Sequence, residues 1–588
     1  MRRSISLDGA WLCRADPSSK PSKFDATGFQ EGINDFRATG PWEPCRVPSV
    51  WNLHKPEYMR YFGTFFYRRS FSIGHVDAGE RVFLKFGAVN YTCIAWVNGN
   101  LAGRHDGGYT SFSFEITNHA RAGEVNEILV YVDNSWGVAD RLPWTRPVDW
   151  FNYGGIHQGV TIEIIPETSI QDVLLDQHVE FAGEGEWPST IQLVVTVAVE
   201  GDATGTRISA SIVPRHGRDP VAEGAAAVEG NAATITLNLN PATTPLWSPD
   251  NPALHDARVA LVDRSGGVVD LHEATVGFRT FETRGCAFFL NNRRFFMKGT
   301  NRHCDHPSFG LAIPGDLIHR DLVLMKSANI NCFRGSHYPN PECTLDACDE
   351  LGLLFIEEIP AWQLQPVHFT TPGILEAAKQ CFDEMHRRDK NHPCLVAWSL
   401  SNETHTDTAE GRTFHEQLYA HARAVDRGHH MIIHVSNKGV RDRCHDLSDF
   451  ITLNIYNGWY GASIDDFPPQ VRLIHEILQD EDQEFGPPRP IVITEFGAGA
   501  IRGYRSLDQP KWSEDFQATL LRRYIGECMD MDFVGGTWTW MFSDTRVDLP
   551  TRPDGRPRSY NNKGMIDEHR VPKLGYDAVK ELYGKWGK

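Results

Sequence analysis

The first half of the chain is a succession of short segments in which apolar and polar residues alternate. Residues 79–100, GERVFLKFGAVNYTCIAWVNGN, combine β-branched and aromatic residues and end at an Asn-Gly pair, which favours a tight hairpin turn. The same period of two continues in TIQLVVTVAVEG at 190–201 and in ATITLNLN at 233–240. We therefore predict two β-sandwich domains, a jelly-roll-like domain over residues 1–166 and an immunoglobulin-like domain over residues 167–280.

The pattern changes after about residue 283, where helix-like segments are each followed by a short apolar strand. In residues 374–388 the apolar side chains fall on one helical face, and the largely apolar stretch LVAWSL at 395–400 follows. The residues of that face are Ile374, Ala378, Cys381, Phe382 and Met385. Repeated units of this kind predict a (β/α)8 barrel over residues 281–588, whose functional side chains follow the carboxyl ends of the strands.

Composition and charge place the chain among globular proteins and narrow its partners. Apolar residues make up 41% of the 588 residues, and charged residues make up 23%. This length corresponds to about three or four domains of ordinary size. The formal net charge of −18 argues against nucleic acid or an acidic membrane surface as the main partner.

The sequence carries no sign of secretion or of membrane insertion. The first residues, MRRSISLDGAWLC, lack the apolar core of a signal peptide, and no stretch of about 18 apolar residues occurs. The 12 cysteines are scattered without a Cys-x-x-Cys pair, which favours free thiols over a disulfide framework. We predict a cytoplasmic protein with no membrane partner.

Two glutamates each follow an apolar strand. Glu403 follows AWSLSN, and Glu495 follows IVIT. Because strand ends of one barrel share the catalytic face, we expect both carboxyls there. Glycoside hydrolysis requires an acid that protonates the leaving group and a carboxylate that stabilises a developing positive charge. The alternative, that each glutamate only caps its strand or pairs with an arginine, is less favoured because there are two of them.

Several motifs resemble those of glycoside hydrolase family 2. NCFRGSHYP at 331–339 and DKNHPCLVAWSLSNE at 389–403 are similar to the two signatures of this family, and ITEFG at 493–497 is similar to its nucleophile strand. AWVNGN and GGYTSFSFEIT in the first predicted domain match as well. The resemblance covers nearly the whole chain and implies two sandwiches followed by a catalytic barrel that needs no cofactor.

The resemblance assigns Glu403 as the general acid/base and Glu495 as the nucleophile of a retaining mechanism. A negative charge on Glu495 favours the protonated form of Glu403, and formation of the glycosyl ester removes that charge. The two carboxyls are expected about 5 to 5.5 Å apart, as in retaining enzymes. Asn402 is expected to donate to the 2-hydroxyl of the sugar.

A second group of motifs resembles the β-glucuronidases of the family. Asn561 and Lys563 in SYNNKGMID match an Asn-x-Lys motif that receives a uronic acid carboxylate, which needs charged and amide donors. Asp149 in VDWFNYGGIHQGV matches an aspartate that reaches the sugar hydroxyls. In LNIYNGWY, Tyr456 is expected to bond the nucleophile, and Tyr460 is expected to approach the carboxylate. An exposed loop lysine is the alternative interpretation of Lys563.

Further pocket residues follow from the same resemblance. His303 in GTNRHCDHP, His337 in FRGSHYP and Trp540 in GGTWTWMF are expected to border the sugar. Pro557 occupies the position of an arginine that some relatives direct to the carboxylate, so Arg558, one residue on, is the candidate replacement. Arg334 fits either a sugar contact or an ion pair within the barrel.

These features predict an exo-glycosidase that releases terminal β-D-glucuronate from a conjugate or an oligosaccharide. The alternatives are a β-galacturonidase, a β-galactosidase of the same family and a carbohydrate-binding protein that has lost catalysis. A metal-dependent hydrolase built on His303, Cys304, Asp305 and His306 is the last alternative, although adjacent residues seldom converge on one ion. The short loop after Glu358 is expected to leave the pocket mouth open, and the resemblance also implies a homo-oligomer.

Overall fold

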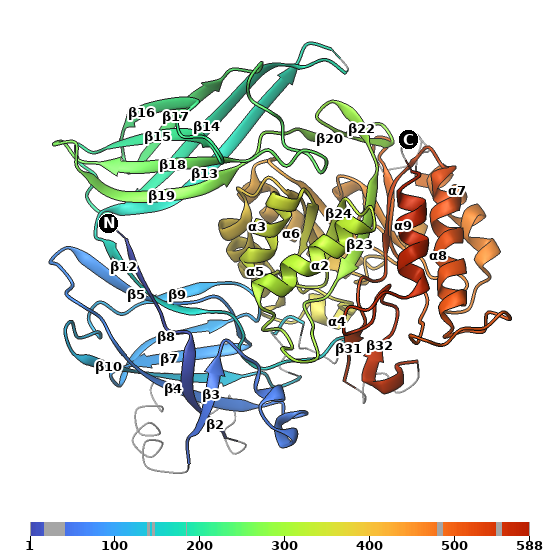
Figure 1. The fold of residues 1–588 in the computed structure, drawn as a ribbon, viewed down its shortest axis with the longest axis horizontal. Coiled ribbons are helices and arrows are strands. Elements are labelled where there is room, and N and C mark those ends of the chain that lie inside the picture. The colour runs from blue at the N-terminus through green and yellow to red at the C-terminus, as the bar shows by residue number, and fades with distance from the viewer. Residues whose placement is uncertain are drawn as a thin grey trace.

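The computed structural model describes residues 2–16, 41–137, 141–143, 148–183, 185–478, 486–548 and 555–586. Two layered β-structures, coloured blue and green in Figure 1, lie against a barrel of strands and helices. The predicted fold class, two sandwiches followed by a (β/α)8 barrel, is confirmed.

The first sandwich has two antiparallel sheets. Strands such as β5 (Glu80–Phe86) alternate inward apolar and outward polar residues, whereas β7 (Thr92–Val97) is buried throughout. In β5, Val82, Leu84 and Phe86 are buried, and the residues between them are partly exposed. One sheet has the order β1-β12-β5-β9, the other has the order β3-β2-β4-β10-β7-β8, and β11 pairs with β6. The strands are β1 (Arg3–Ser6), β2 (Gly9–Ala15), β3 (Glu43–Val47), β4 (Thr64–Ser72), β5 (Glu80–Phe86), β6 (Val89–Asn90), β7 (Thr92–Val97), β8 (Asn100–Asp106), β9 (Phe112–Glu115), β10 (Val125–Asp133), β11 (Gly155–Ile156) and β12 (Val160–Pro166).

The second sandwich pairs a sheet of order β13-β14-β17 with a sheet of order β16-β15-β18-β19. Strand β14 (Pro188–Glu200) buries every second residue from Ile191 onward, which is the period that its sequence predicts. The strands are β13 (Ser169–Phe181), β14 (Pro188–Glu200), β15 (Arg207–Pro214), β16 (Ala222–Ala227), β17 (Ala232–Leu239), β18 (His255–Val262) and β19 (Val268–Val276). A small sheet of β20 (Phe281–Arg284), β21 (Ala287–Leu290) and β22 (Arg293–Phe295) leads into the barrel. We propose that the three domains meet near residues 167 and 281.

Eight parallel strands form the barrel, in the order β27-β26-β25-β24-β23-β30-β29-β28. A parallel bridge between Ser436 and Leu453 joins the two ends of this sheet. The strands are β23 (Met297–Arg302), β24 (Cys332–Gly335), β25 (Leu354–Glu358), β26 (Leu395–Asn402), β27 (Met431–Val435), β28 (Ile451–Asn454), β29 (Ile491–Phe496) and β30 (Val534–Thr539). Because helices cover their outer side, nearly every strand residue is buried, which explains the continuous apolar runs.

Helices surround the barrel, as Figure 1 shows. They are α2 (Gly315–Ser327), α3 (Glu342–Leu351), α4 (Pro366–Phe369), α5 (Ile374–Asp389), α6 (Ala409–Asp426), α7 (Phe467–Leu478), α8 (Glu514–Met529) and α9 (Leu574–Tyr583). Four residues of the predicted α5 face are buried, and the fifth, Cys381, is half-buried. Between β27 and β28 the chain forms two short 3-10 turns, Gly439–Arg441 and His445–Leu447, in place of an α-helix. No helix in the described part of the chain is long and apolar enough to span a membrane.

A segment of the first sandwich reaches the carboxyl end of the barrel. The Trp150 ring lies 5.6 Å from that of His303, measured between centroids. The Tyr153 hydroxyl donates a 2.8 Å hydrogen bond to Asp305, just after β23. These buried contacts hold Asp149 at the barrel. There it meets the strand pair β31 (Thr545–Arg546) and β32 (Tyr560–Asn561), because Asn561 donates to it.

Candidate active site

Glu403 lies directly after β26. One hydrogen bond from its backbone N–H and one to each of its carboxyl oxygens hold it in place. Its backbone N–H donates to the carbonyl of Val435 over 2.8 Å. The Asn454 amide donates to Oε1, and the Gln363 amide donates to Oε2, each over 2.8 Å. The Glu403 backbone has a φ of 51°, a left-handed conformation that non-glycine residues seldom adopt. The carboxyl group is therefore presented in a fixed orientation at the strand end.

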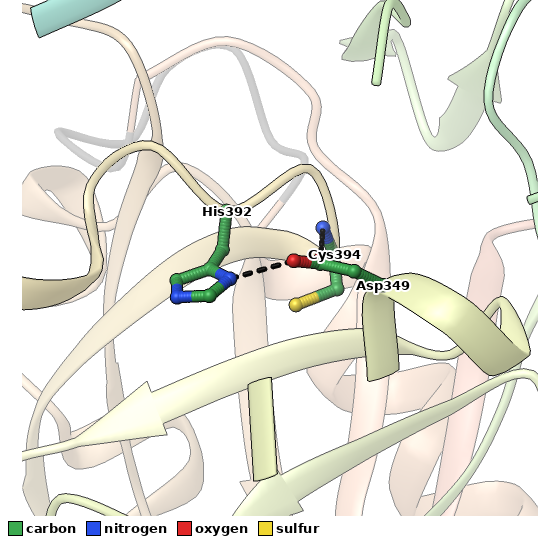
Figure 2. Close-up of side chains that lie close together, drawn as sticks. All are labelled: Asp349, His392 and Cys394. Carbon is green, nitrogen blue, oxygen red and sulfur yellow. Dashed lines mark hydrogen bonds and ion pairs between the residues drawn. The ribbon is translucent and has the colours of Figure 1, made fainter. Parts of the chain in front are cut away.

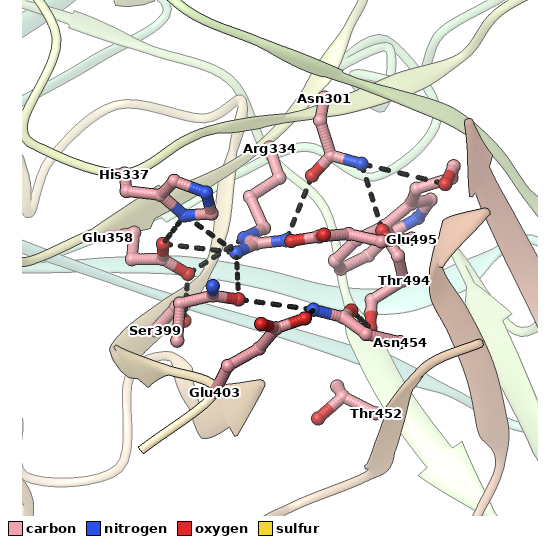
Figure 3. A network of polar contacts seen from close by, with 12 residues as sticks. Asn301, Arg334, His337, Glu358, Ser399, Glu403, Thr452, Asn454, Thr494 and Glu495 are labelled. Atoms are coloured by element: carbon pink, nitrogen blue, oxygen red, sulfur yellow. Dashed lines mark hydrogen bonds and ion pairs between the residues drawn. The ribbon is translucent and has the colours of Figure 1, made fainter. Parts of the chain in front are cut away.

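Glu495 lies near the end of β29, and its side chain is almost completely buried. The Tyr456 hydroxyl donates to Oε2 over 2.9 Å, and Arg334 donates to Oε1 over 3.1 Å. The polar network that holds Glu495 also reaches Glu403 through Asn454 (Figure 3). Both predicted carboxyls therefore belong to one site at the carboxyl end of the barrel.

Arg334 is the fully buried centre of this network. Its guanidinium forms a bidentate ion pair with Glu358, at 2.7 and 3.1 Å, in addition to its contact with Glu495. It also donates to the side-chain oxygens of Asn301 and Asn402. Burial acts to raise the pKa of Glu358, but Arg334 and the neighbouring His337 bring it down to about 2. Of the two interpretations of Arg334, the structure supports the ion-pair partner.

Burial and charge together control the protonation of the carboxyl pair. Burial raises the pKa of Glu495 to about 8, while Arg334 opposes the rise and Glu403 adds to it. The pair therefore retains a proton at neutral pH. Glu495 receives a charge-assisted hydrogen bond from a guanidinium, whereas Glu403 receives hydrogen bonds from two neutral amides. The charged donor acts to favour the ionised form of Glu495, whereas the two neutral amides orient the Glu403 carboxyl without placing a charge beside it.

A cavity of about 190 Å³, called the barrel pocket below, lies between the strand ends. Most residues predicted from the sequence line it: Asp149, His303, His337, Asn402, Glu403, Tyr456, Tyr460, Glu495, Trp540 and Lys563. Four further lining residues are ones that the sequence analysis missed: Trp362, Gln363, Asn437 and Asn454. Of these, Asn454 had a usable signal, because it ends strand β28 just as Glu403 follows β26.

One end of the barrel pocket holds a buried cation. Lys563 is only 2% exposed, and its ammonium donates to the Tyr460 hydroxyl at 2.7 Å and to the side-chain oxygen of Asn561 at 3.4 Å. The ammonium lies 5.8, 5.7 and 5.0 Å from the ring centroids of Tyr456, Trp459 and Tyr460. Burial lowers the pKa of Lys563, and Tyr460 acts against this. Lys563 is thus a pocket residue, and the interpretation as an exposed loop lysine is wrong.

Asp149 is fixed beside this cation by an arginine that the sequence analysis did not name. Arg556 pairs with both oxygens of Asp149, with a distance of 3.0 Å from Nε to Oδ1. The Asn561 amide donates to Asp149 over 3.2 Å. The Arg556 side chain is only 4% exposed, and its charge also acts on Tyr460.

Arg558, the predicted replacement for the carboxylate-binding arginine, is not brought into the barrel pocket. It pairs with Glu568 at 2.8 Å, and half of its side chain is exposed. The chain forms a short 3-10 turn at Pro557–Ser559, within which Arg558 has a φ of 61°. The turn separates the side chains of Arg556 and Arg558, so that the former, not the latter, lies at Asp149.

Three aromatic rings, those of His303, His337 and Trp540, form one wall of the barrel pocket. The Trp540 ring is perpendicular to the His303 ring at 5.4 Å between centroids and stacks on the His337 ring at 5.0 Å. His303 bonds the Tyr338 hydroxyl through Nδ1, while its buried Nε2 has no hydrogen-bond partner among the residues that the structure describes. Burial lowers the pKa of His303 well below its usual value, so the imidazole is neutral. A lining residue with an unsatisfied polar atom is suited to a sugar hydroxyl.

The stretch from His303 to His306 does not form a metal site. The Cys304 thiol donates to the side-chain oxygen of Asn340 over 3.1 Å, and Asp305 accepts from Tyr153. His303 faces the barrel pocket instead. Because these side chains take separate partners, the structure gives no support to the metal-dependent alternative.

Two other groups in the described part of the chain place possible ligand atoms within 4.8 Å of one another: Asp349, His392 and Cys394, and His434, Asp442 and His445. In the first group, His392 lies 2.6 Å from Asp349, which also accepts from the Cys394 backbone (Figure 2). Burial acts to lower the pKa of His392, but the Asp349 carboxylate raises it to about 9. This rise indicates a structural ion pair between the two side chains. Cys394 lies just before β26, and Glu403 lies just after it. The length of this strand, roughly 25 Å, therefore separates this group from Glu403.

The geometry agrees with comparisons to known proteins. The family model for the TIM barrel domain of glycosyl hydrolases family 2 matches residues 281–586. The sugar binding domain model of that family matches residues 4–166, and a third model of the family matches residues 168–279.

Relatives align along the whole chain. A beta-glucuronidase from Paenibacillus borealis is 28% identical over 100% of this chain and 97% of its own length. The structure of a beta-glucuronidase from Ruminococcus gnavus with D-glucuronic acid has a TM-score of 0.85, with 27% identity over 99% of this chain and 98% of that one. The structure of a beta-galacturonidase from Eisenbergiella tayi bound to galacturonate has a TM-score of 0.84, with 28% identity over 100% of this chain and 98% of that one. The chain belongs to glycoside hydrolase family 2 and is a glycoside hydrolase.

Proposed function

We propose that this enzyme hydrolyses terminal β-D-glucuronides with retention of the anomeric configuration. The observation that carries the proposal is the buried ammonium of Lys563 at one end of the barrel pocket. Lys563 and Arg556 contribute +2 and Asp149 contributes −1, which leaves +1 at this end of the pocket. A uronate carboxylate supplies the missing charge, whereas a neutral hexose would leave the ammonium unpaired in a desolvated site.

The two glutamates would divide the chemistry. Glu403 donates its proton to the glycosidic oxygen while Glu495 attacks the anomeric carbon, so that the aglycone leaves and a glycosyl ester forms. The ester has no negative charge, which makes it easier for Glu403 to act as a base. Glu403 then removes a proton from water, and the hydroxyl oxygen displaces Glu495. Two inversions at one carbon give net retention.

The surrounding side chains support this division. Tyr456 and Arg334 each donate to one oxygen of the attacking Glu495 carboxylate. Asn402 lines the pocket, and its side-chain oxygen accepts from Arg334, so its amide nitrogen is the group that would donate to the 2-hydroxyl. The unpaired Nε2 of His303 offers one more sugar contact.

The direct test is a proton NMR time course with an aryl β-D-glucuronide. The β-anomer of free glucuronate is expected to appear first, and the α-anomer is expected only as mutarotation proceeds. An aryl β-D-galacturonide, assayed in parallel, tests the second candidate, which the galacturonate-bound relative favours. Initial release of the α-anomer would contradict the proposed mechanism, and a clear preference for galacturonide would replace the proposed sugar.

Arg556 and Arg558 form a matched pair for mutation. Arg556→Ala is expected to lower kcat/KM for glucuronides by about 10 to 100-fold, because the released Asp149 then neutralises Lys563 in place of the substrate. Arg558→Ala is expected to change it by less than about 2-fold, because its ion pair with Glu568 is half-exposed. Steady-state kinetics of both variants checks this. The reverse order of effects would restore Arg558 as the carboxylate-binding residue.

The pH dependence of kcat/KM should show a loss of activity near pH 8. The raised pKa of Glu495, about 8, means that the carboxyl pair keeps one proton below this pH and loses it above. Activity that needs an acid is therefore present below pH 8 and falls as the pH rises. With an aryl group that leaves without protonation, the fall should shift upward or disappear. A fall that is the same for both aryl groups would point to Lys563 instead.

The predictions of a cytoplasmic location and of a homo-oligomer stay predictions.

A further inference from the structure

The loop after β25 lies along the end of β26, beside the candidate acid/base. Trp362 and Asn402 form a parallel bridge outside the regular sheet. The Gln363 backbone N–H donates to the Asn402 carbonyl over 2.7 Å, and the Asn402 N–H donates to the Ala361 carbonyl over 3.0 Å. Main-chain bonds therefore fix Gln363 directly beside Glu403.

The two neighbours share an unusual backbone conformation. Gln363 has a φ of 45°, and Glu403 has a φ of 51°. Both values lie in the left-handed region, which costs energy for side chains other than glycine and is found where surrounding contacts impose it. In this conformation the Gln363 amide donates to Glu403 Oε2 at 2.8 Å. Gln363 thus has a strained backbone, and its side chain bonds a carboxyl group that lines the pocket. This combination indicates a functional constraint on its conformation.

We propose that Gln363 is a positioning residue for proton transfer by Glu403. The inference rests on the proposed acid/base role of Glu403. With Gln363 on Oε2 and Asn454 on Oε1, the plane of the carboxyl group is fixed from both sides. Proton transfer to the glycosidic oxygen depends on this orientation, because the donor must lie within hydrogen-bond reach of it.

The chemical nature of the two donors matters as much as their position. Glu403 has to be protonated in the first step and ionised in the second. A cation in the place of Gln363 would hold Glu403 ionised, and an apolar residue would leave the carboxyl free to turn. A neutral amide orients the group and still permits both protonation states. Glu495, which has to be ionised when it attacks, is bonded by the charged Arg334 instead.

The test uses Gln363→Met and Gln363→Gly with a series of aryl β-glycosides of the uronic acid that the wild type hydrolyses. Methionine keeps the length of the side chain without a donor. Glycine removes the side chain and suits the left-handed backbone, so this variant should fold at least as well as the wild type. For a poor leaving group, kcat/KM is expected to fall about 10 to 100-fold, within the range of general acid catalysis. For an aryl group that needs no proton, the fall should stay below about 3-fold.

Two comparisons make the outcome decisive. Gln365→Met disturbs the same loop, since its amide bonds the Gln363 carbonyl, and any loss there should be equal for all leaving groups. Glu403→Ala should show the steepest dependence on the leaving group. If Glu403→Ala is steep and the Gln363 variants are flat or fully active, the role of Gln363 is refuted and the proposed function stands. If Glu403→Ala itself is flat, the acid/base assignment fails and the role of Gln363 fails with it.

Discussion

Replacing Glu495 with glutamine is expected to lower kcat/KM for glucuronides by at least about 10⁴-fold, the scale seen when a covalent nucleophile is removed. The amide has nearly the shape of the carboxyl group but cannot form the glycosyl ester. The fold should survive, because Arg334 keeps its bidentate ion pair with Glu358. Steady-state kinetics, with a melting curve for each variant, measures both effects.

Azide distinguishes the roles of the two glutamates. In Glu495→Ala, azide can enter the vacated space and displace the aglycone once, which gives an α-uronosyl azide. In Glu403→Ala, the ester on Glu495 still forms from an activated substrate, and azide then displaces Glu495 to give the β-azide. The anomeric configuration of each product is read by NMR. If the two variants gave the opposite anomers, the nucleophile and the acid/base would have to be exchanged.

Replacing Lys563 with methionine is expected to lower kcat/KM for glucuronides by about 10² to 10³-fold, equivalent to roughly 3–4 kcal/mol. Methionine fills the space between Tyr456, Trp459 and Tyr460 but provides no charge. A bound carboxylate would then lie buried without its cation, which is costly. The same assay is run with an aryl β-D-glucoside, which has a hydroxymethyl group in place of the carboxylate. The difference between the two substrates measures the effect of the substrate's charge.

Activity on the glucoside should stay within about 5-fold of the wild type, because the variant supplies no new hydrogen bonds for a hydroxymethyl group. The ratio of kcat/KM for glucuronide to that for glucoside should therefore fall, because glucuronide hydrolysis is lost and glucoside hydrolysis changes little. Unchanged glucuronide hydrolysis by Lys563→Met would remove the carboxylate contact from the proposal.

The fold could be predicted because the spacing of apolar residues differs between its parts. Alternation in strands such as β14 and a single apolar face on α5 distinguish sandwiches from a barrel. Strand ends in a barrel also meet on one face, which is why Glu403 and Glu495 could be placed together without coordinates. The 3-10 turns between β27 and β28 carry no such period and were not predicted.

The side-chain details of the site could not be predicted, because they depend on loop conformation. The resemblance made Arg558 the candidate for the carboxylate contact, but in the structure Arg558 pairs with Glu568, and Arg556, just before the short turn, pairs with Asp149. Gln363 belongs to a loop whose sequence has no catalytic motif, and only the bridge to β26 reveals its contact with Glu403. Residue type and order determine the strands, whereas backbone angles in the loops decide which polar group reaches the pocket.

The most direct measurement is to trap the glycosyl ester with 2-deoxy-2-fluoro-β-D-glucuronosyl fluoride and to locate it by mass spectrometry of the digested protein. We predict one fluoro-uronosyl group on Glu495 and no such adduct when the corresponding fluoro-glucosyl fluoride is used at the same concentration. An adduct on another residue, or equal labelling by the neutral sugar, would contradict the proposed catalytic arrangement.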